Sequence, residues 1–200
     1  GGGAIIAWED ARDPACTKIY AQRLGYNGKK IWENGSLPLT RVNAQQSGLL
    51  LAPDGKGGAI IVWQDERDVL SLKDLYGQRV SGQGELLWDK NGLAFCSENG
   101  EQAEAAMIPD GAGGVIFTWT DYRRGDRNPD IYAQRVNISG KPLWQKDGVI
   151  VCGAPDIQRS PKIIGDGERG ALIAWTDKGG GSYDIYAQRL NADGKPLWLT

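Results

Sequence analysis

The segment GALIAWTDKGGGSYDIYAQRLNADGKPLW, from Gly170 to Trp198, decides the fold because its pattern occurs four times along the chain. Its first tryptophan belongs to a series at Trp8, Trp63, Trp119 and Trp175, spaced 55, 56 and 56 residues apart. Its second belongs to a series at Trp32, Trp88, Trp144 and Trp198, spaced 56, 56 and 54 residues apart. A fixed period of this kind is the signature of a repeat architecture.

Other residues keep the same register. A tyrosine, then a glutamine two residues on, then an arginine recur before each second tryptophan: Tyr20, Gln22 and Arg23; Tyr76, Gln78 and Arg79; Tyr132, Gln134 and Arg135; Tyr186, Gln188 and Arg189. An Asp-Gly pair precedes three of the first tryptophans, at Asp54-Gly55, Asp110-Gly111 and Asp166-Gly167. Asp-Gly suits turns that require positive φ, so each pair predicts a tight turn between strands.

Each copy predicts four strands, and no segment has the 3.6-residue apolar period of a helix. The first strand is expected at Gly48–Ala52, Ala105–Ile108 and Pro161–Ile164. The second is almost continuously apolar, as in a strand buried on both faces, and is expected at Ala4–Trp8, Ala59–Trp63, Val115–Trp119 and Ala171–Trp175. The third is expected at Lys18–Leu24, Asp74–Val80, Asp130–Val136 and Asp184–Leu190, and the fourth at Leu37–Val42, Leu93–Cys96 and Val149–Cys152.

A four-stranded repeat of this length predicts a β-propeller, an all-β fold whose four-stranded antiparallel blades bury both faces by stacking. We expect residues 1–200 to form a single propeller domain or a propeller fragment, with repeats at about 1–47, 48–103, 104–159 and 160–200. A β-solenoid and separate small sheets are the alternatives, but solenoid coils are usually shorter and a lone four-stranded sheet could not bury both of its faces. The first copy lacks its first strand and the last copy lacks most of its fourth, so the sequence predicts a fragment or trimmed chain with incomplete end blades.

The stretch from Gly170 to Trp198 resembles the sialidase-type, or BNR-like, propeller repeat, in which a strand that ends in W-x-D leads to a second strand and then to an S-x-D-x-G-x-x-W turn. Here Asn191 stands where that turn has serine, and Gly194 sits one place early. The whole repeat is similar to the W-x-D-x-R…D-I-Y-A-Q-R…L-W repeats of large, uncharacterised extracellular bacterial proteins. This second resemblance implies a secreted or cell-surface propeller module and supplies no activity.

Composition excludes several classes of function. The net charge is −2, so the chain has no basic field for nucleic acid, and no apolar run is long enough to span a membrane. The chain has no histidine, the commonest metal ligand and general base, and we expect neither a metal nor a cofactor. The three cysteines are odd in number and form no CxxC, so the sequence predicts neither a disulfide framework nor a zinc site.

The loops between the second and third strands hold the candidate ligand-binding residues, because propeller loops on this side usually carry ligands. These residues are Asp10, Arg12, Asp65, Arg67, Asp121, Arg123, Arg124 and Asp177. An aspartate two residues before an arginine in three successive copies also fits a structural ion pair that repeats with the blade, and this is the favoured interpretation. The charged third loop, residues 122–130, could grip an acidic sugar through its arginines.

The leading functional interpretation is a non-enzymatic binding or scaffold module, because the sequence offers no catalytic residue or acid–base pair that can be singled out. The alternative is a sialidase-like enzyme that processes glycans, and a further alternative is a purely structural repeat. Expected partners are a second copy of the chain that completes the ring, a glycan or a protein. The sequence predicts an extracellular or cell-surface location.

Overall fold

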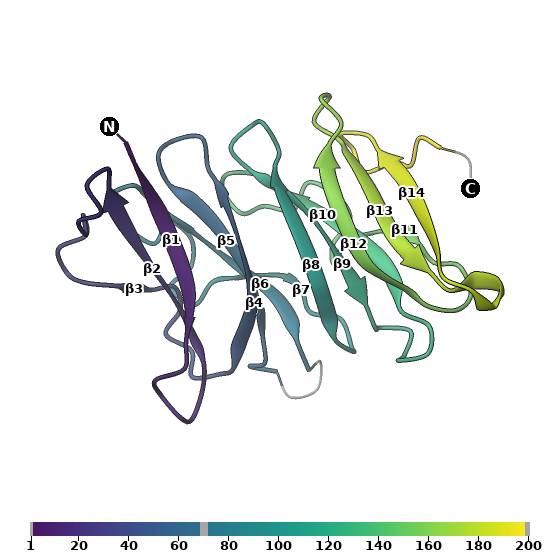
Figure 1. Cartoon of the computed structure of the whole chain (residues 1–200), viewed down its shortest axis with the longest axis horizontal. Coiled ribbons are helices and arrows are strands. Elements are labelled where there is room, and N and C mark those ends of the chain that lie inside the picture. The colour runs from purple at the N-terminus through teal and green to yellow at the C-terminus, as the bar shows by residue number, and fades with distance from the viewer. Residues whose placement is uncertain (1, 69–71, 199–200) are drawn as a thin grey trace.

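The computed structural model describes residues 2–68 and 72–198, and its strands form four antiparallel sheets that follow one another in an arc (Figure 1). The first sheet contains β1 (Gly3–Asp10), β2 (Lys18–Gly25) and β3 (Leu37–Pro38). The second contains β4 (Gln46–Pro53), β5 (Ala59–Asp65), β6 (Asp74–Val80) and β7 (Leu93–Cys96). The third contains β8 (Gln102–Pro109), β9 (Val115–Asp121), β10 (Asp130–Val136) and β11 (Val149–Cys152). The fourth contains β12 (Gln158–Gly165), β13 (Ala171–Asp177) and β14 (Asp184–Leu190).

Within each sheet the strand order follows the chain, as in the blades of a β-propeller. The second and third sheets are complete four-stranded blades, and the first and fourth have three strands each. The predicted fold class, with four partly incomplete blades of about 56 residues, is confirmed. We refer to the sheets as the first to fourth blades and to β4, β8 and β12, which lie side by side, as the inner strands.

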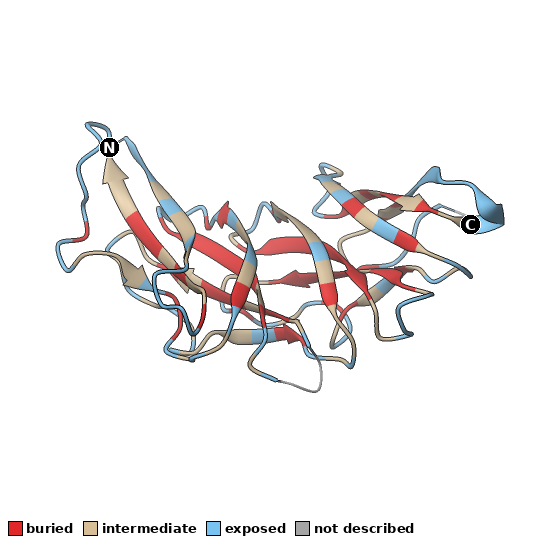
Figure 2. Ribbon diagram, turned by 60° about the horizontal axis from the view of Figure 1, so that its bottom comes forward, coloured by how far each residue is buried: buried red, intermediate tan, exposed pale blue. Residues whose placement is uncertain are grey.

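The core runs through the middle of the arc, where the second strands of the second and third blades are covered on both faces (Figure 2). The predicted burial of both faces does not hold at β1, whose residues are exposed or half-buried because the first blade has a neighbour on one side only. Ala59–Val62 of β5 and Val115–Trp119 of β9 are almost entirely buried, which agrees with their continuous apolar sequence. Aromatic rings connect the second and third blades, since Phe95 packs against Phe117 with ring centroids 5.4 Å apart. Burial of these side chains is the main force that holds neighbouring blades together.

Strand boundaries differ from the prediction mainly at the inner strands. They begin at Gln46, Gln102 and Gln158, two or three residues before the predicted starts. Each of these glutamines is fully buried, and each inner strand has a register shift directly after its first two residues. Such β-bulges break the two-residue alternation, so the apolar pattern alone hides the start of the strand. The first outer strand is also shorter than predicted, since β3 covers only Leu37–Pro38.

The repeated Asp-Gly pairs form turns at the far end of the inner strands. The Asp54 carboxylate accepts hydrogen bonds from the backbone amides of Lys56 and Gly58, both at 2.8 Å. It also forms an ion pair with Arg79 of β6 at 2.8 Å, and the same pair recurs as Arg135–Asp110 at 2.9 Å and Arg189–Asp166 at 3.0 Å. The arginine of every third strand therefore braces a turn of its own blade where that turn is present.

The second tryptophan of each of the first three copies joins its blade to the next one. The indole Nε1 of Trp88 donates to the carbonyl oxygen of Ile138 at 3.1 Å, and that of Trp144 donates to Ala192 at 2.9 Å. The glycine of the receiving turn lies flat against the ring, since a Cβ added to Gly140 would lie 3.0 Å from Trp88. The Trp and Gly positions of the repeat are thus explained by contact between blades.

The three cysteines are free thiols. Cys96 is buried, as predicted, while Cys152 at the same position of the third blade is only partly buried. Cys16, expected in a loop, is also buried, and its Sγ lies 3.1 Å from the side-chain oxygen of Asn43. Among residues 2–68 and 72–198 there is no helix with the length and apolar character needed to cross a membrane.

Candidate functional site

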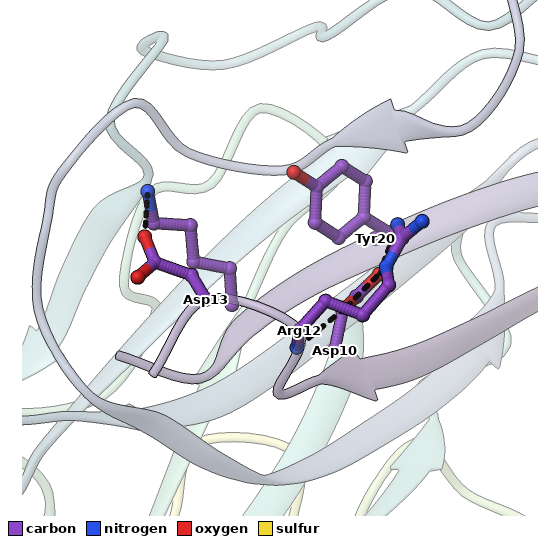
Figure 3. Close-up of a pocket in the computed structure, with 5 residues that line it drawn as sticks. Asp10, Arg12, Asp13 and Tyr20 are labelled. Atoms are coloured by element: carbon purple, nitrogen blue, oxygen red, sulfur yellow. Dashed lines mark hydrogen bonds and ion pairs between the residues drawn. The ribbon is translucent and has the colours of Figure 1, made fainter. Parts of the chain in front are cut away.

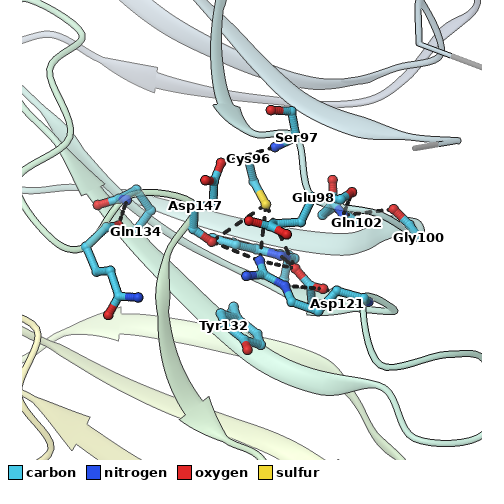
Figure 4. A network of polar contacts seen from close by, with 12 residues as sticks. Cys96, Ser97, Glu98, Gly100, Gln102, Asp121, Tyr132, Gln134 and Asp147 are labelled. Carbon is cyan, nitrogen blue, oxygen red and sulfur yellow. Dashed lines mark hydrogen bonds and ion pairs between the residues drawn. The ribbon is translucent and has the colours of Figure 1, made fainter. Parts of the chain in front are cut away.

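The W-x-D-x-R motif forms one compact unit in the third blade. The indole Nε1 of Trp119 donates to Asp121 Oδ2 at 2.6 Å, and the Arg123 Nη2 donates to the same oxygen at 2.7 Å. The guanidinium of Arg123 stacks over the ring of Tyr132, 3.9 Å from its centroid, and its Nη2 also donates to the carbonyl of Asp147 at 2.9 Å (Figure 4). Asp121 is fully buried by these contacts.

The second blade repeats this unit in detail. Trp63 Nε1 donates to Asp65 Oδ2 at 2.9 Å, Arg67 pairs with Asp65 at 2.6 Å, and Arg67 stacks over Tyr76 at 3.7 Å. In both blades the carboxylate is buried and its charge is neutralised by an arginine of the same loop. The predicted residues of these two loops therefore hold the blade together, and a role for them in ligand binding stays a prediction.

The first blade has a more open version of the pair (Figure 3). Arg12 donates through Nε to Asp10 Oδ1 at 2.8 Å, but 82% of its side chain is exposed, compared with 17% for Arg67 and Arg123. The hydrogen bonds from the Arg12 side chain and amide lower the pKa of Asp10 to about 2. Asp10 is thus an ionised carboxylate throughout the neutral range.

The fourth blade lacks the arginine. Asp177 accepts a hydrogen bond from the backbone amide of Gly179 at 2.7 Å, and Trp175 Nε1 lies 3.4 Å from its Oδ2. Arg124 of the third blade pairs instead with Asp130 at 3.0 Å. Burial raises the pKa of Asp130, and Arg124 opposes that rise. The structure therefore distributes the eight predicted residues over four blades, as three Asp–Arg pairs, Arg124 with Asp130, and Asp177 without an arginine. It does not bring them together into one cluster.

A different set of residues stands out where the repeated backbone carries unlike side chains. The bulge of each inner strand places one residue in the left-handed region, with φ of 62° at Gly48, 52° at Glu104 and 56° at Ser160. A non-glycine residue with positive φ is uncommon and costs about 1–3 kcal/mol, and such strain is concentrated at functional sites. The same backbone position therefore carries no side chain in the second blade, a carboxylate in the third and a hydroxyl in the fourth.

Glu104 joins the inner strands of the third and fourth blades. Its Oε2 accepts hydrogen bonds from the hydroxyl of Thr120 and from the backbone amide of Ser160, both at 2.8 Å. Its Oε1 accepts a bond from the Ser160 hydroxyl at 3.2 Å. The residue is nevertheless exposed, so these contacts fix the orientation of a carboxylate that stays open to solvent.

The negative charge of Glu104 acts on the phenol of Tyr122. Burial raises the pKa of the Tyr122 phenol, the charges of Glu104 and Glu101 raise it further, and Arg159 opposes them. Arg159, the residue before Ser160, donates from Nη2 to the hydroxyl of Tyr183 at 3.1 Å. We refer to Glu104, Tyr122, Arg159 and Tyr183 as the inner-strand site. It combines an oriented carboxylate, two phenols and a guanidinium, which together can hold the hydroxyl groups and ring faces of a sugar.

Sequence reasoning missed the inner-strand site because it searched for residues that recur. The signal that could have found it is the opposite one, namely the positions at which aligned copies differ. The residue at the bulge changes from Gly48 to Glu104 to Ser160, while the glutamine two residues earlier is kept in all three. A side chain that the blade does not need is free to serve a ligand.

Known structures share the fold at low sequence identity. A protein of unknown function from Dyadobacter fermentans DSM 18053 is 12% identical with a TM-score of 0.55, over 92% of this chain and 48% of that one. An α-L-arabinanase from Penicillium chrysogenum, in complex with arabinobiose, is 12% identical with a TM-score of 0.53, over 95% and 60% of the chains. An endo-arabinase from Bacteroides thetaiotaomicron VPI-5482 is 12% identical with a TM-score of 0.51, over 100% and 72%. The chain thus spans about half to three quarters of the length of these proteins.

Comparison of the sequence with protein-family models and with curated proteins gives no match. The interpretation of the chain as a non-enzymatic binding or scaffold module is wrong as the leading one, because two of the structures that share its fold are arabinan-degrading enzymes.

Proposed function

We propose that the chain is part of a glycan-processing propeller that hydrolyses glycosidic bonds at the inner-strand site. The single observation that carries this proposal is Glu104, an exposed carboxylate that three hydrogen bonds hold in a strained backbone position between two blades. Positioned carboxylates are the usual catalytic groups of glycoside hydrolysis. The arabinan-degrading enzymes that share the fold support the same class of substrate.

Glu104 acts as the general base in this proposal. Its carboxylate takes a proton from a water molecule as the water oxygen bonds to the anomeric carbon and the bond to the leaving sugar oxygen breaks. The leaving oxygen takes a proton from a second carboxyl group. Burial and the charge of Glu104 raise the pKa of the Tyr122 phenol, so this group is a hydrogen-bond donor at neutral pH.

The origin of the repeat and the place where the protein works are part of the same proposal. The repeat is related to the BNR-like and extracellular bacterial repeats that it resembles, and the protein works outside the cell, where polymeric glycans are met. A purely structural repeat would not need different side chains at one backbone position. The change from Gly48 to Glu104 to Ser160 therefore supports a function for the inner strands.

The test is to incubate the purified chain with a panel of neutral and acidic polysaccharides and to measure the release of reducing ends. The proposal expects release from at least one of them, and a loss of about 10²–10⁴-fold in Glu104→Gln, the size of a general-base contribution. The matched control is Glu33→Gln, which removes an exposed carboxylate of the first blade. No release from any polysaccharide, or equal rates in wild type and Glu104→Gln, would contradict the proposal.

A further inference from the structure

Arg159, Lys178 and Tyr183 form a basic and aromatic cluster on the fourth blade, next to Glu104. We propose that this cluster binds the carboxylate of an acidic saccharide, so that the substrate is a glycan that contains uronic acid. The inference rests on the proposed function, because it names the substrate class of the same site. It is argued below from the geometry, the charge and the position of the three side chains.

The cluster is held in place by contacts within it. Arg159 Nη2 donates to the Tyr183 hydroxyl at 3.1 Å, and its guanidinium carbon lies 5.0 Å from the centroid of the Tyr183 ring. The ammonium of Lys178 lies 5.8 Å from the same centroid. One exposed ring therefore gathers two cations, and contacts between cations and rings at these distances are attractive. Such an arrangement keeps the guanidinium oriented before a ligand arrives.

Both cations lack an acidic partner. Among the residues that the structure describes, no carboxylate lies within 4.0 Å of the charged nitrogens of Arg159 or Lys178. Seven other arginines do have such partners: Arg12, Arg67, Arg79, Arg123, Arg124, Arg135 and Arg189. Arg23 of β2 has none, but its guanidinium donates to the carbonyl oxygen of Gly82 in the next blade at 2.8 Å. Two like charges that approach one ring repel each other, and an anion placed between them removes that cost.

The blade fold does not require any member of the cluster. The position of Arg159 is occupied by Ser47 and Ala103 in the second and third blades. The position of Lys178 is Ala11, Glu66 or Tyr122 in the other three. The repeated residues around them, by contrast, are explained by ion pairs and blade contacts. The cluster is therefore a feature of the fourth blade alone, as expected for a group that serves a ligand.

The place of Arg159 in the chain connects the cluster to the proposed base. Arg159 directly precedes Ser160, whose amide donates to Glu104 at 2.8 Å. The guanidinium fork of Arg159, which can hold a carboxylate, and the Glu104 carboxylate are therefore carried by neighbouring inner strands, β12 and β8. Tyr122 and Tyr183 offer ring faces for the sugar itself. An acidic peptide would use the cations but would gain nothing from Glu104, so the observations favour a uronic acid.

The experiment measures binding to the purified chain by isothermal titration with three probes: an oligogalacturonate, a neutral arabino-oligosaccharide and a polyglutamate peptide. We expect the oligogalacturonate to bind at least tenfold more tightly than the neutral probe. Arg159→Gln and Lys178→Gln should each weaken it by about tenfold or more, since each removes a charge-assisted contact. Lys195→Gln is the matched control, because it removes one exposed charge of the same blade at the opposite end of β14. It should leave binding within about twofold of wild type, like other exposed charges outside the contact.

Three results would overturn the inference: no binding of the oligogalacturonate, equal binding of the neutral probe, or tighter binding of polyglutamate. Thermal unfolding of each variant shows whether it is folded, and a double variant at Arg159 and Lys178 provides a second measurement. The inference and the proposed function are distinguishable, because Glu104→Gln should retain oligogalacturonate binding. If no saccharide is hydrolysed but Arg159→Gln still abolishes binding, the proposed hydrolysis fails and the acidic-saccharide site stands.

Discussion

The carboxylate of Glu104 accepts a hydrogen bond from the backbone amide of Ser160 at 2.8 Å, although the two residues occupy the same position in successive copies of the repeat. Both residues have positive φ at the bulge of an inner strand. The bulged backbone is common to both copies, and it positions side chains that differ between them. The proposed active site is built on that difference.

A pair in the second blade tests the packing of the repeat. A Cβ added to Gly77 would lie 2.3 Å from Cε2 of Phe95, whereas the corresponding residues of the third blade are Ala133 and Val151. Gly77→Ala should therefore cost about 1–3 kcal/mol of folding free energy through overpacking. In the Phe95→Val background the same substitution should cost at least about 1 kcal/mol less, as urea unfolding of the double-mutant cycle would show. Equal costs in both backgrounds would mean that the two side chains do not compete for space.

The turn between β12 and β13 contains a strained residue. Arg169 has a φ of 65° at the position where the other two turns have Gly57 and Gly113. Glycine adopts this conformation without steric cost, so Arg169→Gly should raise the free energy of unfolding by about 0.5–1 kcal/mol despite the added freedom of the unfolded chain. Chemical denaturation measures the change. A loss of stability would show that the Arg169 side chain contributes more than its backbone costs.

The aspartates of the turns predict how stability depends on pH. Burial alone would raise the pKa of Asp54, but hydrogen bonds from the Lys56 amide, the Arg79 side chain and the Gly58 amide outweigh it and hold the pKa below 3.8. The pKa of Asp166 is lowered in the same way, by the amides of Glu168 and Gly170 and by the Arg189 side chain. Because the folded pKa lies below the unfolded one, this stabilisation is complete above about pH 4 and is lost as the pH falls through the folded value. Burial raises the pKa of Asp130, so the contribution of this residue to stability changes with pH in the opposite direction.

Asp54→Asn is the variant that tests this pH dependence. It should be less stable than wild type at pH 7 and should lose less of its stability between about pH 4 and about pH 2, because it no longer gains a proton on unfolding. Urea unfolding at several pH values gives the comparison, with Asp193→Asn, in an exposed turn, as the control. Parallel curves for wild type and Asp54→Asn would contradict the role assigned to this carboxylate.

The last blade exposes a face that the other blades cover. Ile185 of β14 is 75% exposed, whereas its counterparts Ile19, Leu75 and Ile131 are completely buried. We propose that a second copy of the chain covers this face, because an apolar side chain of this size gains from burial. Light scattering on a sizing column should then give the mass of a dimer, and Ile185→Lys should give a monomer. Ile164→Lys, at another exposed isoleucine of the fourth blade, is the control. A wild-type monomer at every concentration would reject self-association.

The fold could be predicted from the sequence because its signals are repeated and physical. The Trp88 and Trp144 indoles bind the next blade, and the Asp54 and Asp110 carboxylates close turns, so these residues recur wherever a blade recurs. The starts of the inner strands were harder to predict, since the bulge near Glu104 interrupts the alternation of side chains that marks a strand.

The candidate site was harder to predict for the same reason. Charged loop residues such as Asp121 and Arg123 attract attention in a sequence, yet Asp121 is buried against Trp119 and neutralised by Arg123. Glu104 gives no signal of its own until the copies are aligned and their backbone is known to be bulged there. The contact between Glu104 and Ser160 crosses two blades, and no spacing in the sequence indicates its geometry.

Hydrolysis of a glycan by wild type and by Glu104→Gln, measured side by side through chromatography of the released sugars, tests the central claim most directly. The account predicts that wild type releases products from at least one acidic polysaccharide and that Glu104→Gln, folded and as stable to heat as Glu33→Gln, releases them about 10²–10⁴ times more slowly. Unchanged release by Glu104→Gln, or no release by wild type from any polysaccharide, would contradict it.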